Sequence, residues 1–342
     1  EVGDLPISPV TASMVPKRHR ALAFRERSFT IAILYRGSSR DNDMASQLRA
    51  AGHTVRSWEV KDGPDGDLSL EENQQLVLNS LQQFDFIFMC PPCLTTNIAR
   101  KPSMREFPNH LHGRPGLSHA DRKLILEHDA NFEFCGRVAT RADELNKPWV
   151  IEGPASRRLP PCAWSKFAHC VFLWDLPCIM SLNGVYLAFP QCKFSASWQK
   201  YTGLLISQNA WEAWHRIFGD LVCDCKSHAV TLQGYDDITG DARTAIAAEY
   251  VPQLCTAFNT AILDTCSKLV KEGDKDEWVA ELAQMSRTEL CAECASEHAC
   301  SMVNEALKPL SEITDKRDMQ ILLEAPDPSM EIEFKLWQED AE

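Results

Sequence analysis

Short apolar runs alternate with longer polar-and-apolar segments along residues 29–269. A nearly continuous apolar run bounded by turn residues is typical of a strand that is buried on both faces. We therefore predict strands at 29–34, 54–60, 84–89, 148–153, 184–189 and 202–207.

The segments between these runs carry helix signals. Segment 41–52 begins with Asp and Asn and ends at a glycine, which are start and stop signals of a helix. Segment 69–83 opens with Ser69 and has Glu72 three residues later, a pattern that predicts a capping box. Longer helices are predicted at about 117–146 and 241–269. The alternation predicts an α/β fold with a doubly wound, mostly parallel Rossmann-like sheet.

Charge divides the chain into three parts. Residues 1–28 contain the basic cluster KRHRALAFRER and are predicted to form an N-terminal arm. Residues 29–268 form the predicted α/β domain. Residues 269–342 hold 19 acidic and 7 basic residues and are predicted to be an acidic, partly helical C-terminal extension. The extension is a solvated appendage or a surface for a protein partner. It also carries most of the net charge of −13, so the whole-chain charge neither supports nor excludes a nucleic-acid ligand.

The apolar runs and the cysteines bear on location. No uninterrupted apolar run approaches the ~18 residues of a membrane helix, and the first residues lack the pattern of a signal peptide. The 14 cysteines show no compact disulfide spacing. We therefore expect reduced thiols, no membrane contact, and an intracellular location in cytoplasm or nucleus.

Residues just after the first two strands are candidates for ligand contacts, because ligands bind beyond the carboxyl ends of parallel strands. Gly37 allows a tight turn near a helix start. Glu59 could hydrogen-bond the hydroxyls of a ribose, or it could be a solvated strand end. Asp67 lies in a glycine-rich loop and could be a turn residue only.

The third strand runs into Cys-Pro-Pro-Cys, residues 90–93. Two prolines make a stiff turn and hold the side chain of Cys93 over the sheet edge, whereas Cys90 is expected to be buried. A redox pair of Cys90 and Cys93 is an alternative, which the two central prolines disfavour. Glu152 ends the fourth strand, so a carboxylate and a thiol at neighbouring strand ends could act on one substrate.

Taken in order, these segments resemble the cytosine-5 DNA methyltransferases, within the class I S-adenosylmethionine-dependent fold. They look most similar to the divergent methyltransferase-like domains of retroelement polyproteins and viruses. The resemblance covers roughly residues 29–264. Its matching segments include AILYRGSSR, GHTVRSWEV, DGDL, FDFIFMCPPCLTTNIAR with Arg100, LHGRPGL, WVIEGP, CKFSASWQKYTGLL, HAVTLQG and RTAIAAEYVPQLCTAFNTAI.

The resemblance implies a chemistry for three residues. The Cys93 thiol would add to carbon-6 of cytosine and make carbon-5 nucleophilic toward a methyl donor. Glu152 would stabilise the charge that develops at the ring nitrogens, and Lys200 would assist near the ring oxygen. In a duplex the base would be flipped out of the stack.

The resemblance also implies a cofactor, S-adenosylmethionine, and a nucleic-acid substrate, with DNA expected rather than RNA. The residues implied to hold the cofactor are Tyr35, Gly37, Glu59, Asp67 and Pro91.

The chain also departs from the family. Its cofactor loop, YRGSSRD, has one glycine, and Gly153 stands where asparagine is usual. About forty residues separate QKYTGL from the closing helix, which leaves little room for a target-recognition domain. One alternative is therefore a catalytically degenerate module for binding or assembly within a mobile-element or viral protein. Another is a redox or nucleotide-binding α/β protein that uses Cys90 and Cys93.

Two clusters raise the question of zinc. One contains Cys223, Cys225 and His228, and the other is CAECASEHAC at 291–300. Their spacings match no standard zinc finger, and helical spacing in the second also suits plain packing. We assign no metal ligand on the sequence, and a structural zinc ion stays an open alternative.

Overall fold

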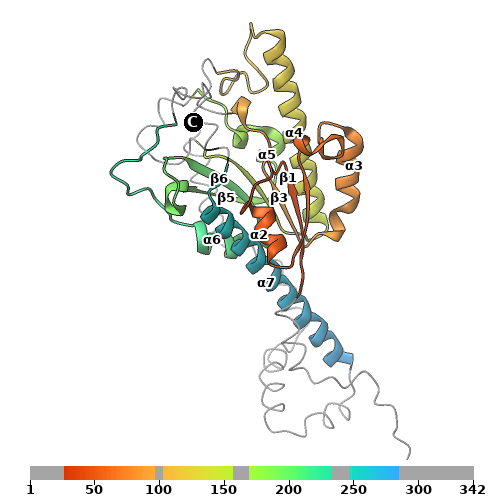
Figure 1. Ribbon diagram of the computed structural model, residues 1–342. Coiled ribbons are helices and arrows are strands. Elements are labelled where there is room, and N and C mark those ends of the chain that lie inside the picture. The colour runs from red at the N-terminus through yellow and green to blue at the C-terminus, as the bar shows by residue number, and fades with distance from the viewer. Residues whose placement is uncertain (1–26, 97–102, 157–168, 233–246, 248, 285–342) are drawn as a thin grey trace, which may run out of the picture. The chain divides into compact units, whose positions relative to one another are not determined.

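The computed structural model describes residues 27–96, 103–156, 169–232, 247 and 249–284. Within them is a six-stranded sheet with the order β2-β1-β3-β4-β6-β5 (Figure 1). The strands are β1 Thr30–Leu34, β2 Thr54–Trp58, β3 Phe86–Met89, β4 Trp149–Pro154, β5 Gly184–Pro190 and β6 Tyr201–Ser207. All six strand predictions are confirmed to within two residues at each end.

Strands β1 to β4 are parallel, whereas β6 pairs antiparallel with β4 and with β5. Parallel pairing of β3 with β4 ends at Met89 and Ile151. Antiparallel pairing of β4 with β6 continues beyond that point, through Glu152 opposite Leu204. The predicted α/β class with a mostly parallel sheet is therefore confirmed.

Helices cover both faces of this sheet (Figure 1). They are α2 Met44–Ala50, α3 Glu71–Ser80, α4 His119–Glu144, α5 Pro177–Met180, α6 Trp211–Phe218 and α7 Pro252–Gln284. Side chains alternate along each strand, so β1 sends Ala32 and Leu34 toward α3, α4 and α5. Its Ile31 and Ile33 pack on the other face, with α2, α6 and the first part of α7.

Helix starts agree with the sequence in part. Asp43 caps α2 by accepting from the Ser46 amide. The capping box predicted from Ser69 and Glu72 is wrong. Helix α3 begins at Glu71, and its N-cap residue is Leu70, whose side chain makes no capping hydrogen bond. The Ser69 amide instead donates to the Asp67 carboxylate at 2.9 Å in a turn of its own. Helix α6 was not predicted.

The chain divides into two compact units between Lys271 and Glu272. In the first unit, Leu254, Phe258 and Ile262 of α7 are buried. Most of the predicted basic arm, residues 1–26, and residues 285–342 of the predicted extension lie outside the described residues. Among the described helices, none has the length and apolarity required to cross a bilayer.

Candidate functional site

The turn after β3 holds Cys93 at the carboxyl end of the parallel strands. The Cys90 amide donates to the Leu34 carbonyl at 3.1 Å, so pairing with β1 continues one residue past β3. After the two prolines, the Cys93 carbonyl accepts from the amide and the hydroxyl of Thr96, at 3.1 and 3.3 Å. These bonds fix the backbone of Cys93 at the start of a short 3-10 helix, Leu94–Thr96. Cys93 and Cys90 are both partly buried, so the expected contrast between them is not seen.

A buried polar network supports this turn. Arg105 is fully buried and donates to Thr95 at 2.9 Å and to Asp129 of α4 at 2.6 Å. The Thr95 hydroxyl also lies 3.2 Å from Nδ1 of His128. Burial and the nearby Arg105 lower the pKa of His128 to about 4, so its ring is neutral at pH 7. No sequence pattern predicts this network, because Arg105 and Asp129 resemble ordinary surface charges.

Glu152 and Lys200 lie at the same edge of the sheet, although the strands β4 and β6 run in opposite directions. Glu152 lies one residue beyond the last parallel pair, Met89 with Ile151, and is 8% exposed. Lys200 immediately precedes β6. Because β6 is reversed, its first residues lie at the carboxyl ends of the parallel strands, where Lys200 Nζ donates to the Ala247 carbonyl at 2.8 Å.

Cys93, Glu152 and Lys200 interact electrostatically. Burial raises the pKa of the Cys93 thiol, while the Lys200 ammonium lowers it and the Glu152 carboxylate raises it further. Burial likewise raises the pKa of Glu152, against the opposing effects of Lys200 and of a hydrogen bond from Tyr250. The structure therefore brings together the three residues that the sequence placed in one site. A thiol lies near a carboxyl group that holds its proton more tightly than usual.

Tyr250 and Cys90 belong to the same group. The Tyr250 hydroxyl donates to the Cys90 sulfur at 3.4 Å and is also hydrogen-bonded to Glu152. Burial raises the pKa values of Cys90 and Tyr250 well above their usual range. Tyr250 was missed because the helix was predicted to begin at about residue 241, whereas α7 begins at Pro252. Proline is favoured in the first turn of a helix. Pro252 therefore indicated that the helix begins there and that Tyr250 lies just before it.

The raised thiol pKa values bear on the redox alternative. Reactive dithiols need a thiol whose pKa is lowered. Burial raises the pKa of both Cys90 and Cys93 here, so neither thiol has the lowered pKa of a reactive dithiol, and the same effect of burial must be overcome for Cys93 to act as a nucleophile.

The predicted cofactor residues occupy the loops at the carboxyl ends of β1, β2 and β3. The Gly37 amide, in a left-handed conformation with φ of 78°, donates to Oε2 of Glu59 at 2.8 Å. Tyr35 also has a positive φ, of 59°, and its hydroxyl donates to Asn131 of α4 at 3.1 Å. Asp67 interacts electrostatically with Tyr35, and Pro91, two residues after the end of β3, is buried. The loops therefore converge, and Gly37 and Glu59 are in direct contact.

Ion pairs brace the loop that contains Gly37. The Arg36 side chain is 7% exposed and pairs with Asp43 at 3.4 Å and with Asp62 at 2.6 Å. Arg40 pairs with Glu249 at 3.1 Å. This loop is therefore held by ion pairs on both sides of Gly37.

Packing accounts for the glycine at position 153. A Cβ atom on Gly153 would lie 2.9 Å from Cδ2 of Leu173 and 3.3 Å from Cζ2 of Trp174. Any larger side chain at this position would require those two residues to move. Arg100, also part of the resemblance, lies outside the described residues.

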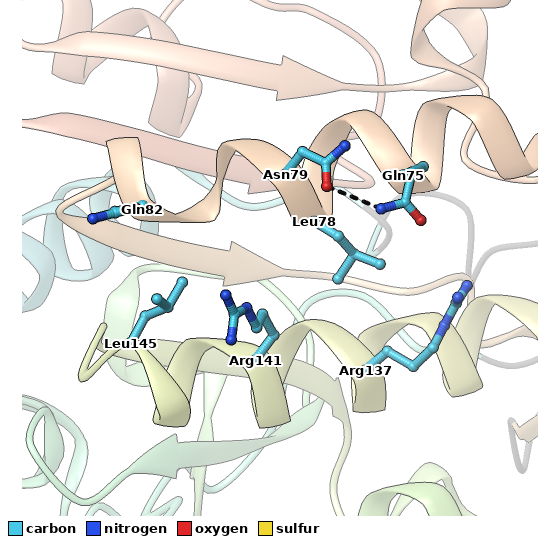
Figure 2. A pocket seen from close by; sticks show the side chains of 7 residues that line it. All are labelled: Gln75, Leu78, Asn79, Gln82, Arg137, Arg141 and Leu145. Carbon is cyan, nitrogen blue, oxygen red and sulfur yellow. Dashed lines mark hydrogen bonds between the residues drawn. The ribbon is translucent and has the colours of Figure 1, made fainter.

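A hollow of about 420 Å³ lies elsewhere, between α3 and α4 (Figure 2). Its lining residues are Gln75, Leu78, Asn79, Gln82, Arg137, Arg141 and Leu145. They belong mainly to the C-terminal halves of helices that lead into β3 and β4, so the hollow lies toward the amino ends of these strands. None of the predicted site residues lines it.

The chain was also compared with known proteins. No protein-family model matches it, and no curated protein matches it either.

Proposed function

We propose that the chain is an S-adenosylmethionine-dependent methyltransferase-like protein that methylates carbon-5 of cytosine in nucleic acid, with Cys93 as nucleophile. The supporting observation is the coupled group of Cys93, Glu152 and Lys200, which comes from three separate segments. The group lies at the carboxyl ends of the parallel strands, where α/β proteins bind their ligands.

The topology supports the class I methyltransferase type of sheet. That fold has a reversed strand inserted beside the edge strand of an otherwise parallel sheet. Here β6 is reversed and lies between β4 and the edge strand β5. The reversal is also what carries Lys200 to the site.

The cofactor loops suit the proposed ligand. Apart from Gly37 and its two chain neighbours, no atom of the described residues lies within 4 Å of the position that a Cβ on Gly37 would take. Among the residues that the structure describes, the Nε atoms of Arg36 and Arg40 have no hydrogen-bond partner, which leaves donors for an anionic group such as a carboxylate. Within the described part of the chain, Glu59 Oε1 accepts only a long bond, 3.4 Å, from the Lys61 amide, so it retains capacity for ribose hydroxyls. S-adenosylmethionine, when bound, supplies the methyl group.

In the proposed mechanism, the residues of the site act on the cytosine ring. The Cys93 thiol gives its proton to water as its sulfur bonds to carbon-6, and the carbon-5–carbon-6 double bond opens, which places electron density on carbon-5. Burial raises the pKa of Glu152, which favours the sharing of a proton between its carboxyl group and a ring nitrogen. Lys200 supplies positive charge near the ring oxygen. Once carbon-5 carries the methyl group, water takes the carbon-5 proton. The carbon-5–carbon-6 double bond then forms again and the Cys93 sulfur leaves carbon-6 as a thiolate, which restores the aromatic ring.

A catalytically degenerate binding or assembly module is the second candidate. Two contacts favour it. Glu59 is already bonded to the Gly37 amide, and the Arg36 ion pairs brace the same loop. A loop closed on its own partners would bind the cofactor weakly.

Two measurements test the proposal. Calorimetry with S-adenosylhomocysteine should show binding that weakens about tenfold or more in Glu59→Gln, which corresponds to at least ~1.4 kcal/mol. Asp65→Asn, at an exposed position of the same loop, is the matched control and should bind normally. Incubation with S-adenosylmethionine and 5-fluorocytosine DNA or RNA should give a covalent adduct, which Cys93→Ser abolishes and Cys178→Ser retains.

The outcomes separate the candidates. Binding of S-adenosylhomocysteine without any adduct would support the degenerate module. An adduct that persists in Cys93→Ser would show that another residue is the nucleophile. Absence of S-adenosylhomocysteine binding would rule out cofactor-dependent catalysis.

A further inference from the structure

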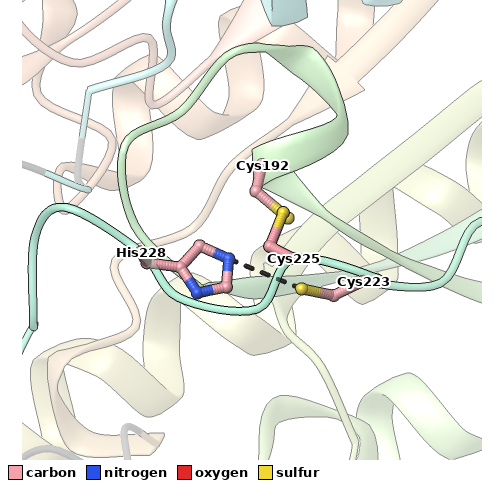
Figure 3. A group of neighbouring side chains, drawn as sticks. All are labelled: Cys192, Cys223, Cys225 and His228. Atoms are coloured by element: carbon pink, nitrogen blue, oxygen red, sulfur yellow. Dashed lines mark hydrogen bonds between the residues drawn. The ribbon is translucent and has the colours of Figure 1, made fainter.

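Four potential metal ligands converge beside the β5–β6 turn (Figure 3). Cys192 comes from the short 3-10 helix Gln191–Phe194 that follows β5. Cys223, Cys225 and His228 come from the loop after α6. The ligand atoms of all four residues lie within 4.8 Å of one another. The sequence did not reveal this set, because Cys192 precedes Cys223 by 31 residues.

We propose that these four side chains bind one structural zinc ion. Three thiolates and one imidazole are a donor set that zinc takes in tetrahedral structural sites. Thiolate ligands disfavour calcium and magnesium, which take oxygen ligands. All four positions of a tetrahedral ion would be filled by protein, so the site has no open position for a substrate and its role is structural.

The present spacing requires little movement to accept the ion. Tetrahedral bonds of about 2.3 Å to sulfur and about 2.0 Å to nitrogen place neighbouring ligand atoms roughly 3.5–3.8 Å apart. Nε2 of His228 already lies 3.4 Å from the Cys223 sulfur. On binding, the three thiols would each release a proton and His228 would coordinate as the neutral ring.

Hydrogen bonds and an ion pair hold the loop that contains Cys223, Cys225 and His228 beside the β5–β6 turn. The Cys223 amide donates to the Tyr201 hydroxyl at 3.1 Å, and the Val230 amide donates to the Ser197 carbonyl at 2.9 Å. Lys193, next to Cys192, pairs with Asp224 at 2.7 Å. The loop is thus attached to the β5–β6 turn on both sides of the cluster.

The fold gives a reason for a metal at this place. The described residues 219–232 form no helix and no strand beyond a single bridge between Val230 and Trp198. Long irregular segments are uncommon in compact domains unless something holds them. A zinc ion would join this segment to the turn that leads directly to Lys200, and would fix that turn without taking part in chemistry.

Metal analysis of the full chain tests this assignment. The second Cys/His cluster, 291–300, lies outside the described residues, so all proteins should carry Cys291→Ser and Cys294→Ser. They should be purified without a metal-binding tag. We expect about one equivalent of zinc by mass spectrometry of the metal content. Cys192→Ser and Cys223→Ser should lose it, and Cys178→Ser should keep it.

Metal binding by His228 variants and the absorption spectrum of bound cobalt test the proposal even if a cysteine variant fails to fold. His228→Cys should retain the metal, whereas His228→Asn should lose it. Cobalt substituted for zinc should show the absorption of a tetrahedral ion with thiolate charge transfer. Full zinc content in Cys192→Ser would overturn the proposal. So would the absence of a cobalt–thiolate signal, or a Cys192–Cys225 disulfide in protein purified anaerobically under reducing conditions.

Discussion

Glu152 is a buried carboxyl group whose negative charge is only partly stabilised by its neighbours. Its carboxyl group is 8% exposed, with Lys200 and Tyr250 as the groups that stabilise its charged form. Its pKa is nevertheless raised, so the destabilisation of the carboxylate by burial exceeds its stabilisation by Lys200 and Tyr250. Carboxyl groups in this state occur at functional sites, where stability is lower than the same fold could reach.

The first prediction at this scale concerns Glu152→Gln. The unfolded carboxyl ionises near its ordinary pKa of about 4.3, below that of the folded protein. Stability is therefore fully present below that pH and is lost as pH rises through the folded pKa. We expect the glutamine variant to melt higher than the parent at pH 7–8, by about 2–4 °C for each kcal/mol. The difference should vanish below about pH 4, measured by thermal unfolding.

Glu133→Gln is the matched control, because Glu133 is exposed on α4. It should leave the melting temperature unchanged across the same pH range. A Glu152→Gln protein that melts lower than the parent at pH 8 would show that the carboxylate stabilises the fold, contrary to the argument from burial.

Two glycines that face each other create a space at the junction of β4 and β6. Gly153 pairs with Gly203, and the ring of Trp174 lies against both. The Trp174 indole also donates to the Pro154 carbonyl at 2.5 Å and meets the Tyr186 ring edge-on, with centroids 5.0 Å apart. The glycine in WVIEGP is therefore part of how the reversed strand packs.

Gly203→Ala tests this packing. The new Cβ would lie 2.6 Å from the Tyr186 hydroxyl and 2.9 Å from Cζ2 of Trp174. Overpacking of this kind costs about 1–3 kcal/mol. We expect a loss of that size in the free energy of unfolding, measured with urea. Gly273→Ala is the control, because its Cβ position has no described atom within 4 Å apart from its chain neighbours and the backbone of its own helix, and alanine favours a helix. Equal stability of the two variants would contradict this account.

The sequence predicted the strands better than their directions. Apolar runs locate buried strands, but a reversed strand buried on both faces has the same pattern as a parallel one. The segment TGLLIS therefore contains no signal that β6 is antiparallel to its neighbours. The eight-residue helix α6 was missed because it is short, and the proposed cap at Ser69 failed because Asp67 forms a competing turn.

The candidate site was predictable where it depends on strand ends. Cys93, Glu152 and Glu59 follow apolar runs, and parallel strands bring such positions to one edge. Tyr250, Arg105 and Cys192 depend on long-range packing, which local pattern does not encode. Tyr250 reaches Cys90 across 160 positions of sequence, and that contact exists only once α7 has docked on the sheet.

At the scale of the molecule, α7 completes the core of the first compact unit. Its Phe258 ring lies 5.2 Å from that of Phe88 in β3 and 5.8 Å from that of Trp214 in α6, measured between centroids. Leu254 and Ile262 are buried in the same cluster. Each such side chain contributes about 1.5–3 kcal/mol by burial, so the three together approach the 5–15 kcal/mol that holds a typical domain.

Two truncations therefore should differ sharply. A chain that ends at Lys271 keeps the whole of the first unit, and we expect it to unfold cooperatively at a temperature close to that of the full chain. A chain that ends at Val251 lacks α7 and exposes the apolar surface around Phe88 and Trp214. It should be insoluble or should unfold without a cooperative transition, as circular dichroism would show. Cooperative unfolding of the shorter chain would mean that α7 is an attachment to a core that is complete without it. Loss of cooperativity in the longer one would mean that residues beyond Lys271 are needed for the first unit to fold.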